Sequence, residues 1–245
     1  MRDGGFDPDP DFVDYDDAWI FACAKHAKIA FDVGANVGQS ALLMLTCANL
    51  EEVVLVEANQ RALATAADNL IRNGLSPRAR FVAAFASDAP DATIDLWTVG
   101  TGAAGSMYRG HAVSAASAGT VQQVRTTTLD ELARRYRVCP DLVKIDVEGA
   151  EASVLAGSTH LVEQRKTRFL VEVHALPELS MARNTALILE WAARAGYAVW
   201  YLANGTKLES PEVVQHRGRC HVLLQPTDWA YPDWLVGIAQ SAKPI

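Results

Sequence analysis

One stretch constrains the fold of this chain more than any other: residues 29–40, which read Ile-Ala-Phe-Asp-Val-Gly-Ala-Asn-Val-Gly-Gln-Ser. The pattern is that of a buried strand that ends in a glycine-rich turn and continues as a helix. A second apolar run, residues 53–57, follows and ends on Glu57. A strand, a glycine turn, a helix and a second strand ending in an acid are typical of an open α/β sheet that binds an adenine nucleoside.

The composition limits the partners that we expect. The 245 residues suffice for one α/β domain, and 50% of them are hydrophobic. The net charge of −7 argues against a nucleic-acid partner, because phosphate backbones attract basic surfaces. No apolar stretch of about 18 residues occurs, so we expect no membrane span. The four cysteines form no CxxC pair, which favours reduced thiols in a cytoplasmic protein.

The rest of the chain alternates between strand-like and helix-like runs. We therefore expect a mostly parallel sheet in a single domain over residues 28–245. Residues 1–27 form an acidic segment and a short amphipathic helix, which we expect to pack on the sheet edge rather than to act as a lid. Strands are expected near residues 28–33, 52–57, 80–86, 93–99, 121–126, 141–146, 167–174, 196–202 and 220–225. Helices are expected near residues 38–48, 60–72, 129–136, 150–156 and 182–195.

The chemistry of the glycine turn indicates which cofactor binds there. The turn reads Asp32-x-Gly34-x-Asn36-x-Gly38, which differs from the GxGxxG of dinucleotide sites. A carboxylate before the first glycine would repel a pyrophosphate but suits an ammonium group. S-adenosylmethionine carries an ammonium and a sulfonium and no phosphate. The glycines would admit the ligand, Asn36 tolerates left-handed backbone, and Glu57 could accept hydrogen bonds from ribose. The rival reading is an NAD-dependent dehydrogenase.

Several further blocks carry a family resemblance. They are residues 31–38, 126–132 (Thr-Thr-Thr-Leu-Asp-Glu-Leu), 141–151 (Asp-Leu-Val-Lys-Ile-Asp-Val-Glu-Gly-Ala-Glu), 154–157 and 169–174. In this order they resemble the FkbM family of S-adenosylmethionine-dependent methyltransferases, over residues 28–205. The resemblance implies a class I methyltransferase fold, which is Rossmann-like. Its seven-stranded sheet is mostly parallel with an antiparallel last strand, and helices cover both faces.

The resemblance also implies an activity and a set of binding residues. We expect O-methylation of a hydroxyl on a small molecule, sugar or natural product. Substrate choice should reside in the acidic N-terminus and in the segment after Pro211, which match no motif. The expected cofactor-binding residues are Asp32, Gly34, Asn36 and Gly38 for the methionine part, Glu57 for the ribose and Phe85 for the adenine, together with Ala35, Ala58, Ser106 and Asp146.

Two neighbouring strand ends supply the candidate catalytic groups. We expect His174 to act as general base, with Asp146 orienting it or the substrate hydroxyl. A structural role for His174, and capping of the next helix by Asp146 or Glu148, are the plainer alternatives. Lys144 in mid-strand needs a partner, and Glu172 is the expected one.

Two questions stay open at the level of sequence. Asp146, Glu148 and His174 could instead ligate a divalent metal, although their spacing is not diagnostic. Methylation of nitrogen or of a peptide, or a binding module that keeps the cofactor pocket without catalysis, are the alternative functions. The sequence specifies neither the methyl acceptor nor the oligomeric state.

Overall fold

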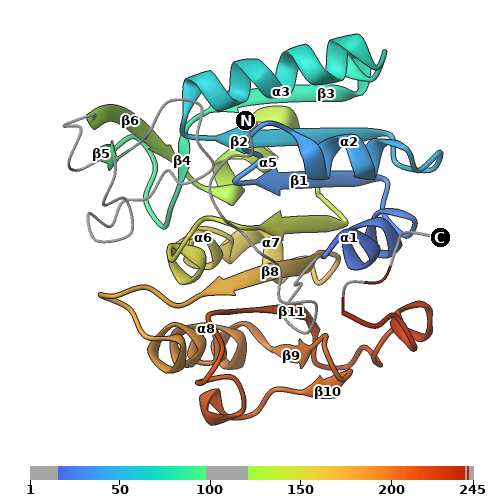
Figure 1. Ribbon diagram of the computed structural model, residues 1–245, viewed down its shortest axis with the longest axis vertical. Helices are drawn as coiled ribbons and strands as arrows, with labels where there is room; N and C mark the ends of the chain where they lie inside the picture. Colours follow the sequence, from blue (N-terminus) through green and yellow to red (C-terminus); the bar gives the residue numbers. More distant parts are fainter. Residues whose placement is uncertain (1–15, 98–120, 241, 243–245) are drawn as a thin grey trace, which may run out of the picture.

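An eight-stranded sheet forms the centre of the computed structural model, which describes residues 16–97, 121–240 and 242 (Figure 1). Its strands are β1 (Ile29–Val33), β2 (Glu52–Glu57), β3 (Ala79–Ala83), β7 (Leu142–Ile145), β8 (Arg168–His174), β9 (Tyr197–Tyr201), β10 (Thr206–Lys207) and β11 (Arg219–Pro226). Their order across the sheet is β10-β9-β11-β8-β7-β1-β2-β3. Strands β3, β2, β1, β7 and β8 pair in parallel, while β11 is antiparallel to both of its neighbours. The mostly parallel sheet and its antiparallel last strand are as predicted.

The eighth strand, β10, is a difference from the predicted seven. It has two residues and pairs antiparallel with the end of β9. The Asn204-Gly205 turn brings it back, because the Asn204 side chain accepts hydrogen bonds from the backbone N–H and hydroxyl of Thr206. A strand of two residues leaves no alternation in the sequence, so hydrophobic periodicity could not reveal it.

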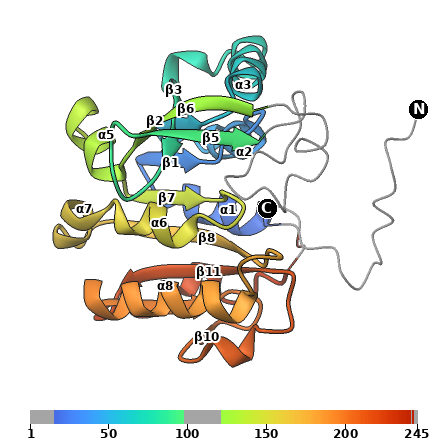
Figure 2. The same ribbon diagram turned by 90° about the vertical axis from the view of Figure 1, so that its left-hand side faces the viewer.

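Helices cover both faces of the sheet, with α1, α2 and α3 on one side and α5 to α8 on the other (Figure 2). Side-chain caps define several helix starts: Asn59, Thr128 and Ser180 each accept a hydrogen bond from a backbone N–H of the first turn of α3, α5 and α8. Among the described residues, no helix is long and apolar enough to cross a bilayer. The helices are α1 (Asp17–Ala24), α2 (Gln39–Leu45), α3 (Gln60–Arg72), α5 (Leu129–Tyr136), α6 (Glu151–Ala156), α7 (Thr159–Glu163) and α8 (Met181–Ala195).

Helix α1 differs from the expected amphipathic helix on the sheet edge. Six of its eight residues are buried, so it has no polar face. It contacts α2 and β7, and its Trp19 ring N–H donates to the carbonyl of Ile238. Helix α1 therefore packs on a face of the sheet, between α2 and the C-terminal segment, and belongs to the core of that face.

A second sheet of three short strands lies beyond the carboxyl ends of the parallel strands (Figure 1). It contains β4 (Phe85–Ala86), β6 (Val121–Thr127) and β5 (Thr93–Trp97), in that order. The run expected as one strand over 80–86 divides at residue 84, because β4 leaves β2 and β3 and pairs with β6. The strands expected near 93–99 and 121–126 are β5 and β6.

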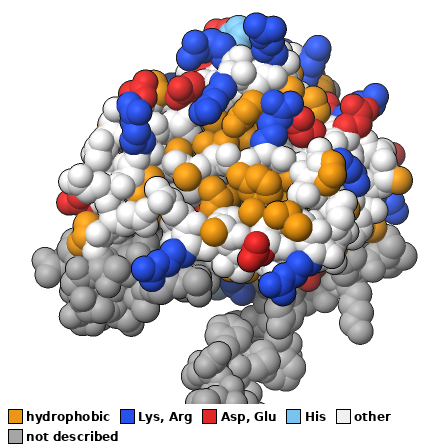
Figure 3. Space-filling view, turned by 90° about the horizontal axis from the view of Figure 1, so that it is seen from above, with side chains coloured by type: hydrophobic (Ala, Val, Ile, Leu, Met, Phe, Trp, Pro, Cys, Tyr) orange, Lys and Arg blue, Asp and Glu red, His pale blue; other side chains and the backbone are white. Residues whose placement is uncertain are grey.

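The surface over the β3 edge of the main sheet carries both charged and hydrophobic side chains. Figure 3 looks onto the α3 and β3 side and shows Lys and Arg side chains interspersed with acids around hydrophobic ones. On β3 itself, Arg80 pairs with Glu52 at 2.7 Å and lies over the Tyr136 ring. A charged side chain on an exposed edge strand disfavours pairing with another chain.

Candidate active site

The strand order reverses between β1 and β7. From β1 the chain adds β2 and β3 on one side, and from β7 it adds β8 on the other. Helices on opposite faces leave a crevice at such a point, beyond the carboxyl ends of the strands. Strand β7, which ends next to Asp146, pairs with β1 and with β8, which carries His174, so the two strand ends expected to supply the catalytic groups are neighbours.

The glycine turn after β1 adopts left-handed backbone at three positions. The φ angles are +77° at Gly34, +46° at Asn36 and +81° at Gly38. A Cβ on Gly34 would lie 1.7 Å from the carbonyl oxygen of Asp146, and one on Gly38 would lie 2.9 Å from the Cβ of Ala66. Both positions therefore require glycine, because a side chain there would clash with neighbouring parts of the chain. This requirement is independent of any ligand.

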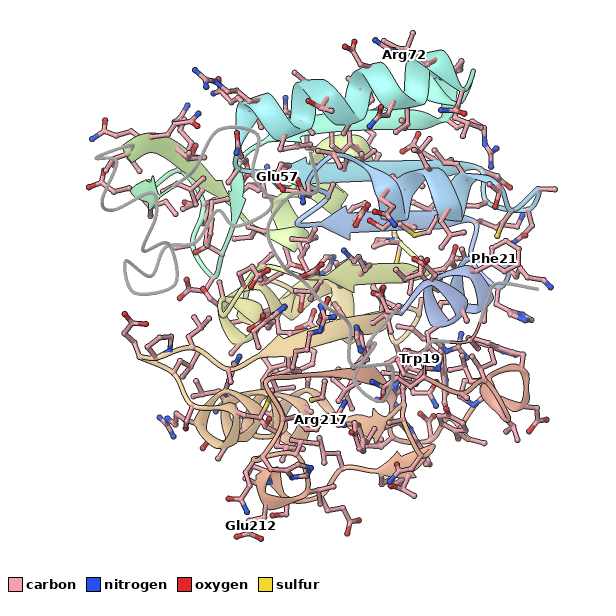
Figure 4. All side chains as sticks on the ribbon, viewed as in Figure 1. Trp19, Phe21, Glu57, Arg72, Glu212 and Arg217 are labelled. Carbon is pink, nitrogen blue, oxygen red and sulfur yellow. The ribbon has the colours of Figure 1, made fainter. Side chains whose placement is uncertain are left out.

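Glu57 stands at the carboxyl end of β2, on the side where β4 leaves the main sheet (Figure 4). Its two carboxylate oxygens accept hydrogen bonds from the backbone N–H groups of Asn36, at 2.9 Å, and Asn59, at 2.7 Å. Burial raises the pKa of Glu57, and the two N–H groups oppose that rise. A carboxylate has about four acceptor positions, so this one retains capacity for ribose hydroxyls.

Asp32 is fully buried behind the turn and already has a cationic partner. Its carboxylate accepts a hydrogen bond from the Ser40 hydroxyl at 2.7 Å and lies 3.6 Å from the Lys144 ammonium. Burial raises the pKa of Asp32, and Lys144 and Ser40 oppose the rise. The ammonium beside Asp32 in this structure thus comes from the protein chain.

Lys144 does not pair with Glu172, contrary to the sequence-based expectation. Its ammonium lies 3.1 Å from Asp146 and 3.6 Å from Asp32. The register explains this, because Lys144 stands opposite Asp32 on β1 and opposite Leu170 on β8, two residues short of Glu172. Burial would lower the pKa of Lys144, but the charges of Asp146 and Asp32 outweigh burial and raise it.

A cavity opens at the carboxyl ends of β1, β2, β7 and β8. Glu57 and Asp146 line it from opposite sides of β1, and β4 and β5 contribute an apolar wall with Phe85 and Leu96. The full lining comprises Gly34, Asn36, Val56, Glu57, Ala58, Asn59, Ala62, Ala84, Phe85, Leu96, Asp146, Val147, Glu148, Glu172, His174 and Arg219.

Most of the residues singled out from sequence meet in this cavity. Those that line it are Gly34, Asn36, Glu57, Ala58, Phe85, Asp146 and His174. Asp32, Ala35 and Gly38 do not line it: Asp32 and Ala35 are buried behind it, and Gly38 is the N-cap of α2. Ser106 lies outside the described residues.

His174 is surrounded by acids at the far end of the cavity. Its Nε2 lies 3.8 Å from Asp146 Oδ1, 3.7 Å from Glu148 Oε2 and 3.7 Å from Glu172 Oε1. Glu148 reaches this position through a turn after the end of β7, where its φ is +52°. A left-handed conformation at a residue other than glycine costs about 1–2 kcal/mol, so the surrounding structure holds Glu148 in place.

Glu151 and Asn184, which sequence reasoning did not assign to the site, orient His174 from behind. The Nδ1 atom of His174 donates to Glu151 Oε1 at 2.9 Å. The Asn184 amide donates to Glu151 Oε2 at 2.8 Å and to the His174 carbonyl at 3.0 Å. Glu151 follows Glu148 in the expected motif, but only the folded chain shows that the two acids face different nitrogens of one ring.

The protonation of His174 disfavours the general-base role predicted for it. Burial would lower its pKa, but the hydrogen bond to Glu151 and the charges of Glu148 and Asp146 outweigh burial and raise the pKa to about 9. At neutral pH an imidazole with this pKa already holds its proton and accepts no other.

Arg219 on β11 is a further lining residue that sequence reasoning missed. It donates to Glu172 at 3.0 Å. Burial would raise the pKa of Glu172, but the nearby His221, at 3.7 Å, and the charges of His174 and Arg219 lower it to about 2. The segment after Pro211, which matched no motif, thus brings β11 and a guanidinium to the cavity.

The cavity suits S-adenosylmethionine better than a dinucleotide. Carboxylates of Glu57, Asp146 and Glu148 line it and favour a cationic sulfonium over a pyrophosphate. Phe85 and Leu96 offer an apolar surface to an adenine ring.

Comparison with known proteins identifies the family. The model of the methyltransferase FkbM domain matches residues 32–199, more than half of the chain. A search of curated proteins gives no match.

Among solved structures, the FkbM methyltransferase of Methylobacillus flagellatus is similar, with 18% identity and a TM-score of 0.50 over 81% of this chain. The chain spans 43% of the length of that protein, and at this identity the likeness establishes the fold alone.

Two other similar structures are those of a precorrin-6y C5,15-methyltransferase from Geobacter metallireducens and an rRNA methylase from Streptococcus thermophilus. The first has 11% identity and a TM-score of 0.48, and covers 85% of this chain and 86% of its own. The second has 9% identity and a TM-score of 0.49, and covers 85% of this chain and 93% of its own. The match to the family, the parallel sheet and the cavity beside Glu57 lead to one conclusion: the chain belongs to the FkbM family of S-adenosylmethionine-dependent methyltransferases.

Proposed function

We propose that the protein transfers a methyl group from S-adenosylmethionine to a hydroxyl of a small molecule or glycan. The observation that carries this proposal is the group of acids around His174, which lines the same cavity as Glu57. We call these acids, Asp146, Glu148 and Glu172, the acidic cluster. With the ribose on Glu57 and the adenine against Phe85, the methionine part extends across β1 toward Asp146. The reactive methyl then faces the cluster.

The cluster supplies what an alcohol acceptor needs. The acceptor oxygen must lie within about 3–3.5 Å of the methyl carbon and in line with the carbon–sulfur bond. Its proton passes to a carboxylate that lines the cavity, and its electron pair forms the new bond to carbon. The carbon–sulfur bond breaks with its electrons on sulfur, which becomes the neutral thioether of S-adenosylhomocysteine. Asp146 and the charged His174 orient the hydroxyl.

Charge and the cysteines support a small, cytoplasmic substrate over a nucleic acid. The chain has a net charge of −7, and several lining residues of the cavity are acids. Phosphate backbones would be repelled from such a surface. All four cysteines are free thiols, as is usual in reducing compartments.

Two measurements test the proposal. Calorimetry should show binding of S-adenosylhomocysteine and none of NAD; the reverse result would sink the cofactor assignment. Incubation of metabolite and glycan extracts with methyl-labelled cofactor should label a hydroxylated compound. Label on nitrogen or on peptides alone would contradict O-methylation, and binding without any labelled product would favour a module that has lost catalysis.

A further inference from the structure

We propose that Asp146, Glu148 and His174 bind a divalent transition-metal cation at the acceptor end of the cavity. The ligand atoms are one carboxylate oxygen of each acid and Nε2 of the imidazole, which all lie within 4.8 Å of one another. The cation site stands on geometry alone, whereas its part in methyl transfer rests on the proposed function.

The first support is the orientation of the His174 imidazole. The His174 residue is only 8% exposed, and the bond from Nδ1 to Glu151 fixes the ring. Nε2 therefore points toward Asp146, Glu148 and Glu172, at 3.8, 3.7 and 3.7 Å, and these distances are too long for hydrogen bonds. A buried nitrogen aimed at carboxylates without hydrogen-bonding any of them leaves room for a cation. The cation would replace the proton that Nε2 otherwise carries, because a nitrogen that binds a metal must be deprotonated.

The second support is the spacing of the ligand atoms. Metal–ligand distances of about 2.0–2.2 Å place neighbouring ligand atoms roughly 3.0–3.6 Å apart. The two distances from Nε2, 3.7 and 3.8 Å, need a contraction of only a few tenths of an ångström, and the two carboxylate oxygens lie within 4.8 Å of each other. Asp146 and Glu148 are partly exposed and can make this adjustment, while the buried ring stays fixed.

The third support is the set of residues that hold the ligand side chains in place through hydrogen bonds. Metal-binding histidines commonly donate their second nitrogen to a carboxylate, which fixes the ring and its tautomer. Glu151 fills this role and is itself held by Asn184 and by the Gly149 backbone N–H. Asp146 is held in the same way, because Lys144 binds its other oxygen, Oδ2, at 3.1 Å.

The ligand set indicates which cation fits. An imidazole nitrogen favours transition metals over Mg²⁺ and Ca²⁺, and two carboxylates among three ligands favour Mn²⁺ over Cu²⁺. Three protein ligands leave positions open for water and for the acceptor hydroxyl, as in catalytic metal sites. A cation there would polarise that hydroxyl, so that a carboxylate could remove its proton.

A second group of possible ligands, Asp16, Glu172 and His221, lies nearby. It is the weaker candidate because Glu172 already accepts a hydrogen bond from Arg219 at 3.0 Å. The two groups share no residue, so variants distinguish them.

Electron paramagnetic resonance with Mn²⁺ alone tests the proposal, because the signal of free Mn²⁺ falls as the ion binds. We expect one bound equivalent in the wild type and at least about tenfold weaker binding in Glu148→Gln and in His174→Gln. The matched control is Glu163→Gln, since Glu163 also lies beside a histidine, His160 at 3.3 Å, but on the exposed surface of α7. This control should bind Mn²⁺ like the wild type.

Other outcomes overturn the inference. Absence of Mn²⁺ binding by the folded wild type, or equal binding by Glu148→Gln and His174→Gln, would place no cation at this cluster. Loss of binding only in Glu172→Gln would assign the cation to the second group. Calorimetry with S-adenosylhomocysteine in EDTA runs alongside: cofactor binding without Mn²⁺ binding ends the metal proposal alone, and Mn²⁺ binding without cofactor binding ends the proposed function alone.

Discussion

At the scale of single residues, Lys144 is a buried cation that lies between the carboxylates of Asp32 and Asp146. Lys144 needed a buried partner, and that much followed from its apolar neighbours. The choice between Asp32 and Glu172 depended on the register of β7 against β1 and β8. Register is set by pairing across the whole sheet, so it could not be read from the local pattern around Lys144.

The buried ion pairs of Lys144 predict a large loss of stability on substitution. Lys144→Met leaves Asp32 and Asp146 without their cation and should lower the free energy of unfolding by about 3–5 kcal/mol. Lys28→Met is the control, because Lys28 pairs with Glu51 on the surface with its side chain 74% exposed. The control should lose at most about 1 kcal/mol. Urea denaturation measures both, and equal losses would contradict the buried-pair account.

Glu57 predicts a specific loss of cofactor binding. Glu57→Gln keeps the shape of the side chain but removes a charged acceptor, so S-adenosylhomocysteine should bind about 10- to 100-fold more weakly. Glu52→Gln is the matched control at the other end of the same strand, where the carboxylate holds Arg80. Calorimetry that gives both variants wild-type affinity would remove Glu57 from the ribose site.

At the scale of elements, the long apolar runs predicted the main strands, and capping residues explain several helix starts. The missed features were short: the two residues of β10, the five residues of α7, and the division of 80–86 into β3 and β4. Helix α1 was predicted, but its burial was not. It is buried by the sheet and by the neighbouring α2 and C-terminal segment, which only the fold brings together. Tertiary contacts decide such features, and local sequence does not carry them.

The turn between β1 and α2 predicts that alanine destabilises the protein more at Gly34 than at Gly74. Gly34→Ala forces a Cβ into the Asp146 carbonyl and should cost at least about 3 kcal/mol, together with loss of cofactor binding. Gly74→Ala has a similar φ of +69° but meets nothing within 4 Å, so about 1 kcal/mol is expected. Thermal and urea unfolding compare the two. A Gly34→Ala protein as stable as Gly74→Ala would refute the close packing of β1 on β7.

At the scale of the whole molecule, α1 and the sheet share one core, so we expect them to unfold together. Burial raises the pKa of Cys23 on α1 to about 12, and this thiol should resist iodoacetamide until global unfolding. Cys139 is only half-buried and should react at least about tenfold faster in the native protein. Mass spectrometry across a urea series follows both thiols. Early labelling of Cys23 would show that α1 opens by itself.

The central claim concerns where the cofactor lies relative to the acidic cluster, and a crystal structure with S-adenosylhomocysteine tests it most directly. The account predicts ribose hydroxyls on Glu57, adenine against Phe85 and the sulfur directed at Asp146 and His174. A ligand bound elsewhere, or one whose sulfur faces away from the cluster, would contradict it.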